Sequence, residues 1–436
     1  MKPISNRNSL VFRSALRGCR SVVLTLLLLA PFCSSHANWN PVVPESVGMS
    51  GERLGRLDAA FEKMIEQEKL PGTVTLVMRQ GKVVHYSALG FRDKESQAPM
   101  QKDTLFRIAS QTKAVVSVGV MVLQEQGKLH LNDPVGKYLP EFMQTNVAQA
   151  TDDGYEVVPA KRAITIRDLL MHTSGVAYGN GPGEDLWKKA GIQGWYFANR
   201  DEPIRDVVRR MASLPFQAHP GEQWVYGYST DILGALIEVV SGQPLDVFLK
   251  AELFDPIGMG DTHFFLPDYK AGRLATVYGY QNGRLFRGPE LGNMGQGAYV
   301  EGPRRCFSGG AGLVSTAKDY AAFLQMLADE GVVSGGRILS RKSVELMRIN
   351  HLAPEVGYPW GNGMGFGLGF SVVLDPGMRG ELGSKGEFGW GGAYHSSYWI
   401  DPEEDLVVVY FTQVIPAENL NDHQLLRNLV YQSIVD

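Results

Sequence analysis

A serine and a lysine, Ser110 and Lys113, stand three residues apart at the start of a long apolar stretch. In a helix, this spacing puts both side chains on one face, about one turn from each other. Residues 114–123 are apolar at nearly every position, which predicts a helix that is buried on most sides. The positive N-terminal end of that helix favours a developing anion and disfavours a protonated amine. A hydroxyl next to a neutral amine is a nucleophile with its base, so Ser110 and Lys113 are candidates for such a pair. The alternative is that this short pattern occurs by chance.

The same spacing occurs a second time, at Ser315 and Lys318. There, Thr316 and Asp319 have the spacing of a helix capping box, and the residues that follow are plainly amphipathic. We therefore interpret the second copy as the start of a helix and nothing more.

Tyr226 is the second candidate, within Tyr226-Gly227-Tyr228-Ser229. A tyrosine placed against a neutral lysine and a serine can move a proton between them. The alternative is a packed aromatic residue whose hydroxyl is satisfied by the surrounding protein. The motif alone leaves both interpretations open.

The third candidate is the stretch Gly389-Trp390-Gly391-Gly392-Ala393, just before a predicted hairpin. Glycines allow a backbone to approach a ligand closely, and a backbone N–H offered there, together with that of Ser110, would form an oxyanion hole. The alternative is a simple bulge or turn. His395 follows closely and is either a substrate contact or a structural residue.

Residues 1–37 have the pattern of an export signal. Five basic residues precede a short apolar core at residues 22–30, and Ser35-His36-Ala37 is a cleavage site of small residues. The core is too short for a helix that spans a membrane, so we expect cleavage after Ala37 and no stable membrane anchor. A retained anchor is the alternative. The remaining residues, 38–436, would form the mature domain of a periplasmic or secreted protein.

Composition excludes several classes of partner. The first 37 residues hold five basic and no acidic residues, so their removal takes the formal charge from −4 to about −9. An acidic chain is a poor partner for nucleic acid or for anionic membranes.

Cys306 is the only cysteine beyond the predicted signal, so we expect no internal disulfide and a fold that is stabilised by packing. The sequence makes no prediction about the oligomeric state.

Strand and helix patterns from both ends of the chain predict one antiparallel sheet. The stretches rich in β-branched and aromatic residues form two tight hairpins, at residues 72–91 and 396–413, with helices predicted at 51–67 and 420–435. Between the hairpins, from about 134 to 304, helical patterns alternate with loops rich in glycine and proline, and no strand pairing is evident. The helical patterns in this part cover residues 166–171, 205–212, 232–240 and 245–253. The chain is therefore predicted to be α+β, with a mainly helical insertion.

Other hydrolytic and cofactor chemistries lack their motifs. The sequence has no full G-x-S-x-G, no H-E-x-x-H, no phosphate-binding loop lysine and no dinucleotide fingerprint after a strand. Its nine histidines show no metal-ligand spacing. We therefore predict neither a metal nor a cofactor.

Taken in order, the motifs Ser110-Gln-Thr-Lys113, Tyr226-Gly-Tyr228 and Trp390-Gly-Gly392 resemble those of the serine β-lactamase and penicillin-binding protein superfamily. The resemblance is closest to the class C-like branch that includes the family VIII carboxylesterases, and it covers essentially all of residues 38–436. It implies a β-lactamase/transpeptidase-like fold, in which an antiparallel sheet is flanked by helices and a helical subdomain spans approximately residues 134–304. It also implies a small-molecule ester or lactam as the partner. In the family's terms, Ser110 would be acylated, Lys113 would activate it, and Tyr226 would be the general base or proton shuttle. The backbones of Ala393 and Ser110 would form the oxyanion hole.

Two departures from the family pattern bear on the substrate. Trp390-Gly391-Gly392 stands where β-lactamases have a Lys-Thr/Ser-Gly motif, and Trp390 cannot supply the positive charge that holds a carboxylate. Tyr228 stands where class C enzymes have an asparagine. Both changes replace polar anchors with aromatic surface, which favours a neutral ester, and we expect Trp390, Tyr228 and His395 to line its pocket. The alternatives are a class C-like β-lactamase or D-alanyl peptidase, and a penicillin-binding or sensing protein that is acylated without turnover.

Overall fold

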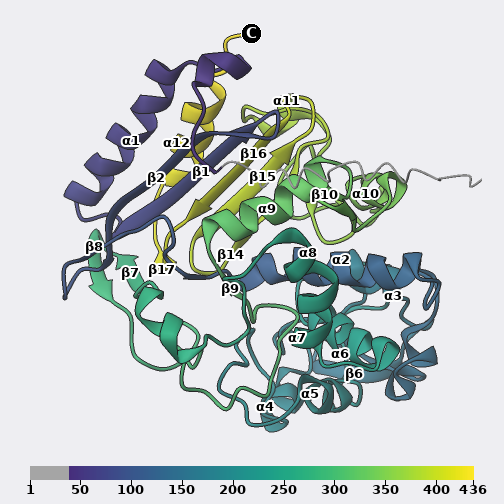
Figure 1. The fold of residues 1–436 in the computed structure, drawn as a ribbon. Helices are drawn as coiled ribbons and strands as arrows, with labels where there is room; N and C mark the ends of the chain where they lie inside the picture. The colour runs from purple at the N-terminus through teal and green to yellow at the C-terminus, as the bar shows by residue number, and fades with distance from the viewer. Residues whose placement is uncertain (1–38) are drawn as a thin grey trace, which may run out of the picture. The chain divides into compact units, whose positions relative to one another are not determined.

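The computed structural model describes residues 39–436 (Figure 1). The predicted export signal and its cleavage site lie outside the described residues. Within residues 39–436, no single helix is both long and apolar enough to cross a membrane; one bent pair, Ser229–Ser241 with Leu245–Ile257, reaches that length and composition only when both helices are taken together.

An eight-stranded antiparallel sheet joins the two ends of the described chain, as the two predicted hairpins require. Its order is β12-β13-β14-β15-β16-β1-β2-β3, and the central neighbours β1 and β16 are more than 300 residues apart in sequence, with Val74 opposite Phe411 and Arg79 opposite Leu406. The strands are β1 Gly72–Arg79, β2 Lys82–Asp93, β3 Ala98–Pro99, β12 Met364–Phe366, β13 Ser371–Val373, β14 Phe388–Gly392, β15 Ser396–Asp401 and β16 Leu406–Phe411.

Both faces of the central strands are covered by helices, because their side chains are apolar in both directions. Strand β16, Leu-Val-Val-Val-Tyr-Phe, is buried at every residue. The side chains on one face pack against α1 and α12, and those on the other belong to the same apolar core as α2 and α9 (Figure 1). These helices are α1 Gly51–Glu66, α2 Thr112–Glu125, α9 Ala317–Ala328 and α12 Asp422–Tyr431.

The predicted helical region contains the expected helices, which lie around α2 and α6. It also contains strands that the sequence did not predict. Its helices are α3 Ile166–Leu170, α4 Glu184–Lys189, α5 Ile204–Met211, α6 Ser229–Ser241, α7 Leu245–Leu249 with a π turn at Lys250–Phe254, and α8 Asp255–Ile257. The expectation of no strand pairing was wrong, because β5 Asn146–Thr151 pairs with β6 Gly154–Pro159 and β7 Tyr278–Gln281 pairs with β8 Arg284–Arg287. These strands are short, and β5, β6 and β8 are largely exposed, so they lack the apolar pattern that marks a buried strand. The limits of a helical subdomain stay a prediction.

Shorter elements complete the described chain. Strand β17 runs parallel to β7, β4 pairs with β9, and β10 pairs with β11. The remaining bounds are β4 Phe106–Arg107, β9 Val314–Ser315, β10 Val332–Val333, β11 Gly336–Arg337, β17 Val414–Ala417, α10 Arg341–Met347 and α11 Pro376–Arg379.

Two helix ends test the local predictions. The second serine–lysine pattern is confirmed as a helix start, because the Thr316 side chain accepts the backbone N–H of Asp319 at the beginning of α9. The predicted C-terminal helix is shorter than expected and ends at Tyr431, since the backbone N–H of Ser50 donates to Ser433 and Ile434 bridges to Met49. The last residues therefore pair with the N-terminal segment rather than continue the helix.

Candidate active site

Ser110 lies in a short 3₁₀ turn, Ala109–Gln111, that leads directly into α2. Ala109 has a φ of +43°, a conformation that a non-glycine residue adopts only when its surroundings enforce it. The turn is held from two sides: the Gln111 side chain donates to Ser396 Oγ over 3.1 Å, and the Tyr320 hydroxyl donates to the Gln111 carbonyl over 3.0 Å. The serine is thus presented by a strained but well-anchored backbone.

Lys113 points at Ser110, as their spacing predicts. Its ammonium group donates to Ser110 Oγ at 3.2 Å, to the Tyr178 hydroxyl at 2.9 Å and to the Gly310 carbonyl at 2.7 Å. The side chain is 2% exposed, and α2 is buried from Thr112 to Leu123. All three hydrogens of a protonated amine are therefore engaged, and loss of one leaves a base beside the serine hydroxyl.

Tyr226 comes from the turn before α6, and its ring lies beside the lysine. Lys113 Nζ is 4.6 Å from the ring centre, and the Tyr226 hydroxyl accepts a 3.2 Å hydrogen bond from Trp390 Nε1. The fold thereby brings residues 110, 113, 226 and 390 to one place. Trp390 stands where the family pattern has a lysine, and its indole N–H donates to the Tyr226 hydroxyl. A neutral hydrogen-bond donor therefore replaces a charged one.

Tyr178 is a member of the site that the sequence did not reveal. Its hydroxyl contacts Lys113, and its ring meets that of Tyr226 edge to face, with centres 5.6 Å apart. Burial, followed by the nearby hydroxyl of Tyr226, raises the pKa of Tyr178 well above its usual value, so this phenol keeps its proton. The residue follows the turn His172-Thr-Ser-Gly175 in a loop, and no pattern in the sequence distinguishes it from other tyrosines.

The end of β14 touches the serine turn backbone to backbone. A Cβ atom on Gly392 would lie 2.5 Å from the Ile108 carbonyl oxygen, so only glycine fits at this position. The chain then turns tightly through Ala393, with the His395 N–H donating to the Gly392 carbonyl at 3.0 Å. Strand β13 pairs with β14 only at Phe388 and Gly389. The glycine end of β14, together with Ala393, therefore lines the space in front of Ser110.

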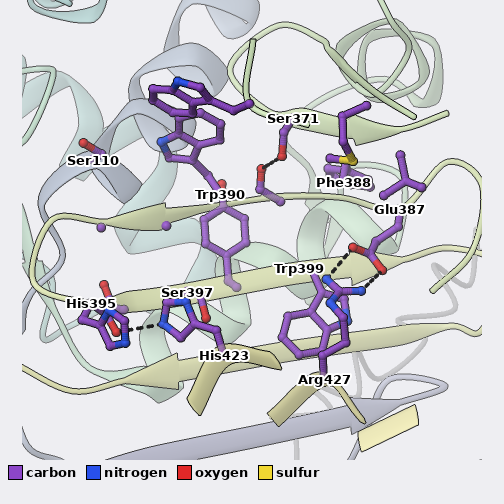
Figure 2. A pocket seen from close by; sticks show the side chains of 18 of the residues that line it. Ser110, Ser371, Glu387, Phe388, Trp390, His395, Ser397, Trp399, His423 and Arg427 are labelled. Carbon is purple, nitrogen blue, oxygen red and sulfur yellow. Dashed lines mark hydrogen bonds and ion pairs between the residues drawn. The ribbon is translucent and has the colours of Figure 1, made fainter. Parts of the chain in front are cut away.

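A cavity of about 570 Å³ opens at Ser110. Figure 2 shows Ser110 at one end, Arg427 at the other, and the strand that carries Trp390 between them. Aromatic rings form much of the wall near the serine, and Trp360, which is 55% exposed, stacks on Trp390 with ring centres 5.4 Å apart. The rings that line this part are Tyr178, Trp195, Tyr226, Trp360 and Trp390.

The structure contradicts the prediction that Tyr228 lines the pocket. Tyr228 is fully buried (0% exposed) in the helical region, where its hydroxyl donates to the Gly194 carbonyl at 2.8 Å and its ring stacks on Trp187 and Phe197. Only one tyrosine of the Tyr-Gly-Tyr motif can face the cavity, because Tyr226 and Tyr228 point in different directions from the turn before α6. Tyr228 supports the core instead.

His395 does reach the cavity, but its ring is held by a buried carboxylate. Its Nε2 lies 2.7 Å from Asp422 Oδ1, and the buried Asp422 carboxylate also accepts the Tyr410 hydroxyl at 2.6 Å. The ring stacks nearly flat on His423, at 4.1 Å and 14° (Figure 2). The ligand atoms of His395, Asp422 and His423 are close together, yet stacked rings cannot direct both in-plane lone pairs at one ion. The cluster has the contacts of a structural support for the turn after β14.

Comparison with known sequences adds the family. The sequence model described as Beta-lactamase matches residues 57–430. The chain belongs to the beta-lactamase family. Among its relatives, Protein Rv1367c of Mycobacterium tuberculosis is 36% identical, covering 82% of this chain and 89% of that protein. Esterase EstB of Burkholderia gladioli is 34% identical to this chain, and the match also covers 82% of this chain and 89% of that protein.

A solved structure agrees with the sequence comparison. EstCE1, described as a hydrolase with promiscuous acyltransferase activity, has a TM-score of 0.76 at 28% identity and covers 87% of this chain and 99% of that chain. The predicted class C-like membership and the α+β β-lactamase/transpeptidase-like fold are therefore confirmed. The protein is a serine hydrolase of the beta-lactamase family. The roles of individual site residues stay predictions.

Proposed function

We propose that the protein is a carboxylesterase that works through an acyl-enzyme at Ser110. The observation that carries this proposal is the contact between Lys113 Nζ and Ser110 Oγ, 3.2 Å long, at the end of an aromatic-walled cavity. The names of the relatives EstB, an esterase, and EstCE1, a hydrolase, support it.

The geometry supports a two-step acyl transfer. Ser110 Oγ attacks the ester carbonyl carbon while its proton passes to the Lys113/Tyr226 pair. The carbonyl oxygen becomes an anion and accepts hydrogen bonds from the backbone N–H groups of Ser110 and Ala393. The C–O bond of the ester then breaks, and the alcohol leaves with the proton from the pair. A water molecule repeats these steps on the acyl-enzyme, releases the acid and restores Ser110.

The charges along the cavity favour an uncharged ester. Trp390 offers a neutral N–H in front of Tyr226. At the far end, Arg427 and Arg379 donate to the buried carboxylate of Glu387 over distances of 2.7 Å and 2.9 Å. Cations that are already paired attract a substrate carboxylate weakly, so a lactam drug would lack its usual anchor.

The test compares turnover of p-nitrophenyl butyrate and of nitrocefin by the purified protein. We expect fast ester hydrolysis, slow lactam hydrolysis, and loss of both in Ser110→Ala. Ser315→Ala is the matched control, because Ser315 belongs to the other serine–lysine pattern and contacts Thr262 instead of the cavity. An active Ser110→Ala protein would disprove the nucleophile.

Three other outcomes would favour the other functions. Faster turnover of nitrocefin than of the ester would favour a β-lactamase, and trimming of a D-Ala-D-Ala peptide would favour a D-alanyl peptidase. A stoichiometric burst without further turnover would favour a penicillin-binding protein that stays acylated.

We further propose that the protein is exported and cleaved after Ala37. The supporting observation is the basic, apolar and small-residue pattern of residues 1–37. N-terminal sequencing of protein recovered from the periplasm or medium of an expressing Gram-negative cell should begin at Asn38. Retention of the uncut chain in the membrane fraction would contradict the proposal.

A further inference from the structure

An unbroken chain of hydrogen bonds runs from Lys113 to a buried carboxylate that never reaches the cavity. Lys113 donates to the Gly310 carbonyl at 2.7 Å, and the N–H of Ala311 donates to Ser308 Oγ at 3.2 Å. The Gly310 carbonyl and the Ala311 N–H belong to one planar peptide group. The Ser308 hydroxyl then donates to Asp231 Oδ1 at 2.6 Å. Every donor along the chain points away from the lysine and towards the carboxylate.

Asp231 is fixed in place by its own contacts. It lies in the first turn of α6, is 1% exposed, and also accepts the Gly310 N–H at 3.0 Å. The loop of residues 309–312 packs against it so closely that a Cβ atom on Gly310 would lie 2.4 Å from Asp231 Oδ2. The same carboxylate therefore holds the residue whose carbonyl binds the lysine.

Among the described residues, few charged groups lie near this chain of hydrogen bonds. Burial raises the pKa of Asp231, while Ser308, the charge of Lys113 and the Gly310 N–H act in the opposite direction. Two donors converge on Oδ1, an arrangement that an ionised carboxylate accepts, and Oδ2 has no hydrogen-bond partner among residues 39–436. The other titratable groups that face Asp231 or Lys113 are Tyr178, Tyr226, Tyr228, His172 and Cys306.

We propose that Asp231 is a positioning residue, which holds Lys113 against Ser110 through Ser308 and the Gly310–Ala311 peptide and supplies the counter-charge for the lysine's ammonium group. Hydrogen bonds that all point in one direction polarise and strengthen one another, and a buried charge needs a partner. Asp231 itself touches neither the nucleophile nor the substrate. The inference rests on the proposed function, since it assigns Lys113 a part in activating Ser110.

The charge has a predictable effect on the pH dependence. A carboxylate near Lys113 favours the protonated amine, whereas activation of Ser110 requires the Lys113/Tyr226 pair to take up a proton. Asp231→Asn retains an oxygen for Ser308 and Gly310 but removes the charge. The rise of reactivity with pH should therefore begin at lower pH in this variant, by about one unit.

The experiment measures how fast an alkyl fluorophosphonate labels Ser110 between pH 5 and 10, using intact-mass and peptide mass spectrometry. This probe reports the reactivity of the serine without requiring the natural substrate. We expect the Asp231→Asn profile to move to lower pH by about one unit. Ser308→Ala, which breaks the chain but keeps the charge, should instead lower the labelling rate at the plateau by roughly tenfold.

The matched control is Asp319→Asn, which alters a buried carboxylate in the first turn of another helix, α9. Its labelling profile should coincide with that of the unmodified protein. The inference is overturned if the Asp231→Asn and Ser308→Ala proteins remain folded in thermal melts and their labelling profiles coincide with that of the unmodified protein. If Asp231→Asn fails to fold, the plateau labelling rate of Ser308→Ala decides: a lower rate supports the inference, and an unchanged rate overturns it. If the unmodified protein is not labelled at Ser110 at all, the proposed function itself fails.

Discussion

The ammonium group of Lys113 binds oxygens from three separate segments: the serine turn, the loop that holds Tyr178, and the glycine loop at Gly310. A side chain with four rotatable bonds loses considerable entropy when it is fixed in this way. The three hydrogen bonds offset that cost and leave the amine in one orientation towards Ser110. The orientation of the amine towards Ser110 therefore depends on residues from outside the serine turn.

Tyr178→Phe tests this dependence. The change removes the 2.9 Å bond to Lys113 but leaves the ring in place. A hydrogen bond to a charged group contributes about 1.5–3 kcal/mol, so we expect kcat/KM on p-nitrophenyl butyrate to fall about 10- to 100-fold. Tyr228→Phe is the matched control: its hydroxyl contacts the Gly194 carbonyl in the core, so the variant should lose thermal stability and keep most of its activity. Equal activity losses in the two variants would contradict a specific role for Tyr178.

Trp390→Phe separates the indole donor from the aromatic wall. Phenylalanine keeps a ring against Trp360 but cannot donate to the Tyr226 hydroxyl. A neutral hydrogen bond is worth about 0.5–1.5 kcal/mol, so kcat should fall roughly 2- to 10-fold with little change in KM. Steady-state kinetics on the same ester measure both values. A change in KM alone would show that Trp390 only forms part of the cavity wall and that its hydrogen bond to Tyr226 does not contribute to kcat.

At the scale of elements, the site depends on how closely β14 approaches the turn before α2. Strand β14 belongs to the sheet and Ser110 to the start of a buried helix, so the distance between them is set by packing on both sides. Gly392 is the residue that permits the contact. The hairpins and the buried helix were predictable because each has a local pattern, whereas their contact was not.

Gly392→Ala should separate these elements. The added methyl would lie 2.5 Å from the Ile108 carbonyl oxygen and 2.6 Å from Ser396 Oγ, so the strand or the turn must move. Displacing one oxyanion donor costs roughly 100- to 1,000-fold in kcat, which is the loss we expect for ester turnover. Gly391→Ala is the neighbouring control, since its methyl would meet only the Ser396 carbonyl, at 3.0 Å. Equal losses at both positions would refute a special role for the close approach at Gly392.

At the scale of the whole molecule, carboxylates with depressed pKa values make the described domain sensitive to acid. Hydrogen bonding from Tyr138, and then from Lys137, lowers the pKa of Asp133 to about 2. Burial alone would raise the pKa of Asp261, but its bonds to Arg273 and Lys270 bring it to about 2. In the unfolded chain such groups titrate near pH 4.

The stability that these carboxylates contribute should therefore be fully present above about pH 4 and should fall as the pH approaches 2. The reason is that the folded form must then take up protons against these hydrogen bonds. Thermal unfolding followed by circular dichroism between pH 6 and pH 2 measures the effect. Asp133→Asn should show a smaller decline than the unmodified protein. An identical decline would indicate that other groups control acid unfolding.

The sequence by itself determined the parts of this protein whose signal is local. The three-residue spacing of Ser110 and Lys113, the two hairpins, the buried helix and the capped start of α9 all follow from patterns within a few turns or strands. Family membership followed from three short motifs taken in order.

Only the tertiary structure decided which distant residues complete the site. Tyr178 and Gly310 meet Lys113 across 65 and 197 residues, and Asp231 joins the same hydrogen-bond chain from another helix. Tyr226 and Tyr228 are alike in sequence, yet one faces the cavity and the other the core. The physical reason is that packing brings these groups together: the way α6 and the glycine loop settle on α2 depends on the whole core, and no short stretch carries that information.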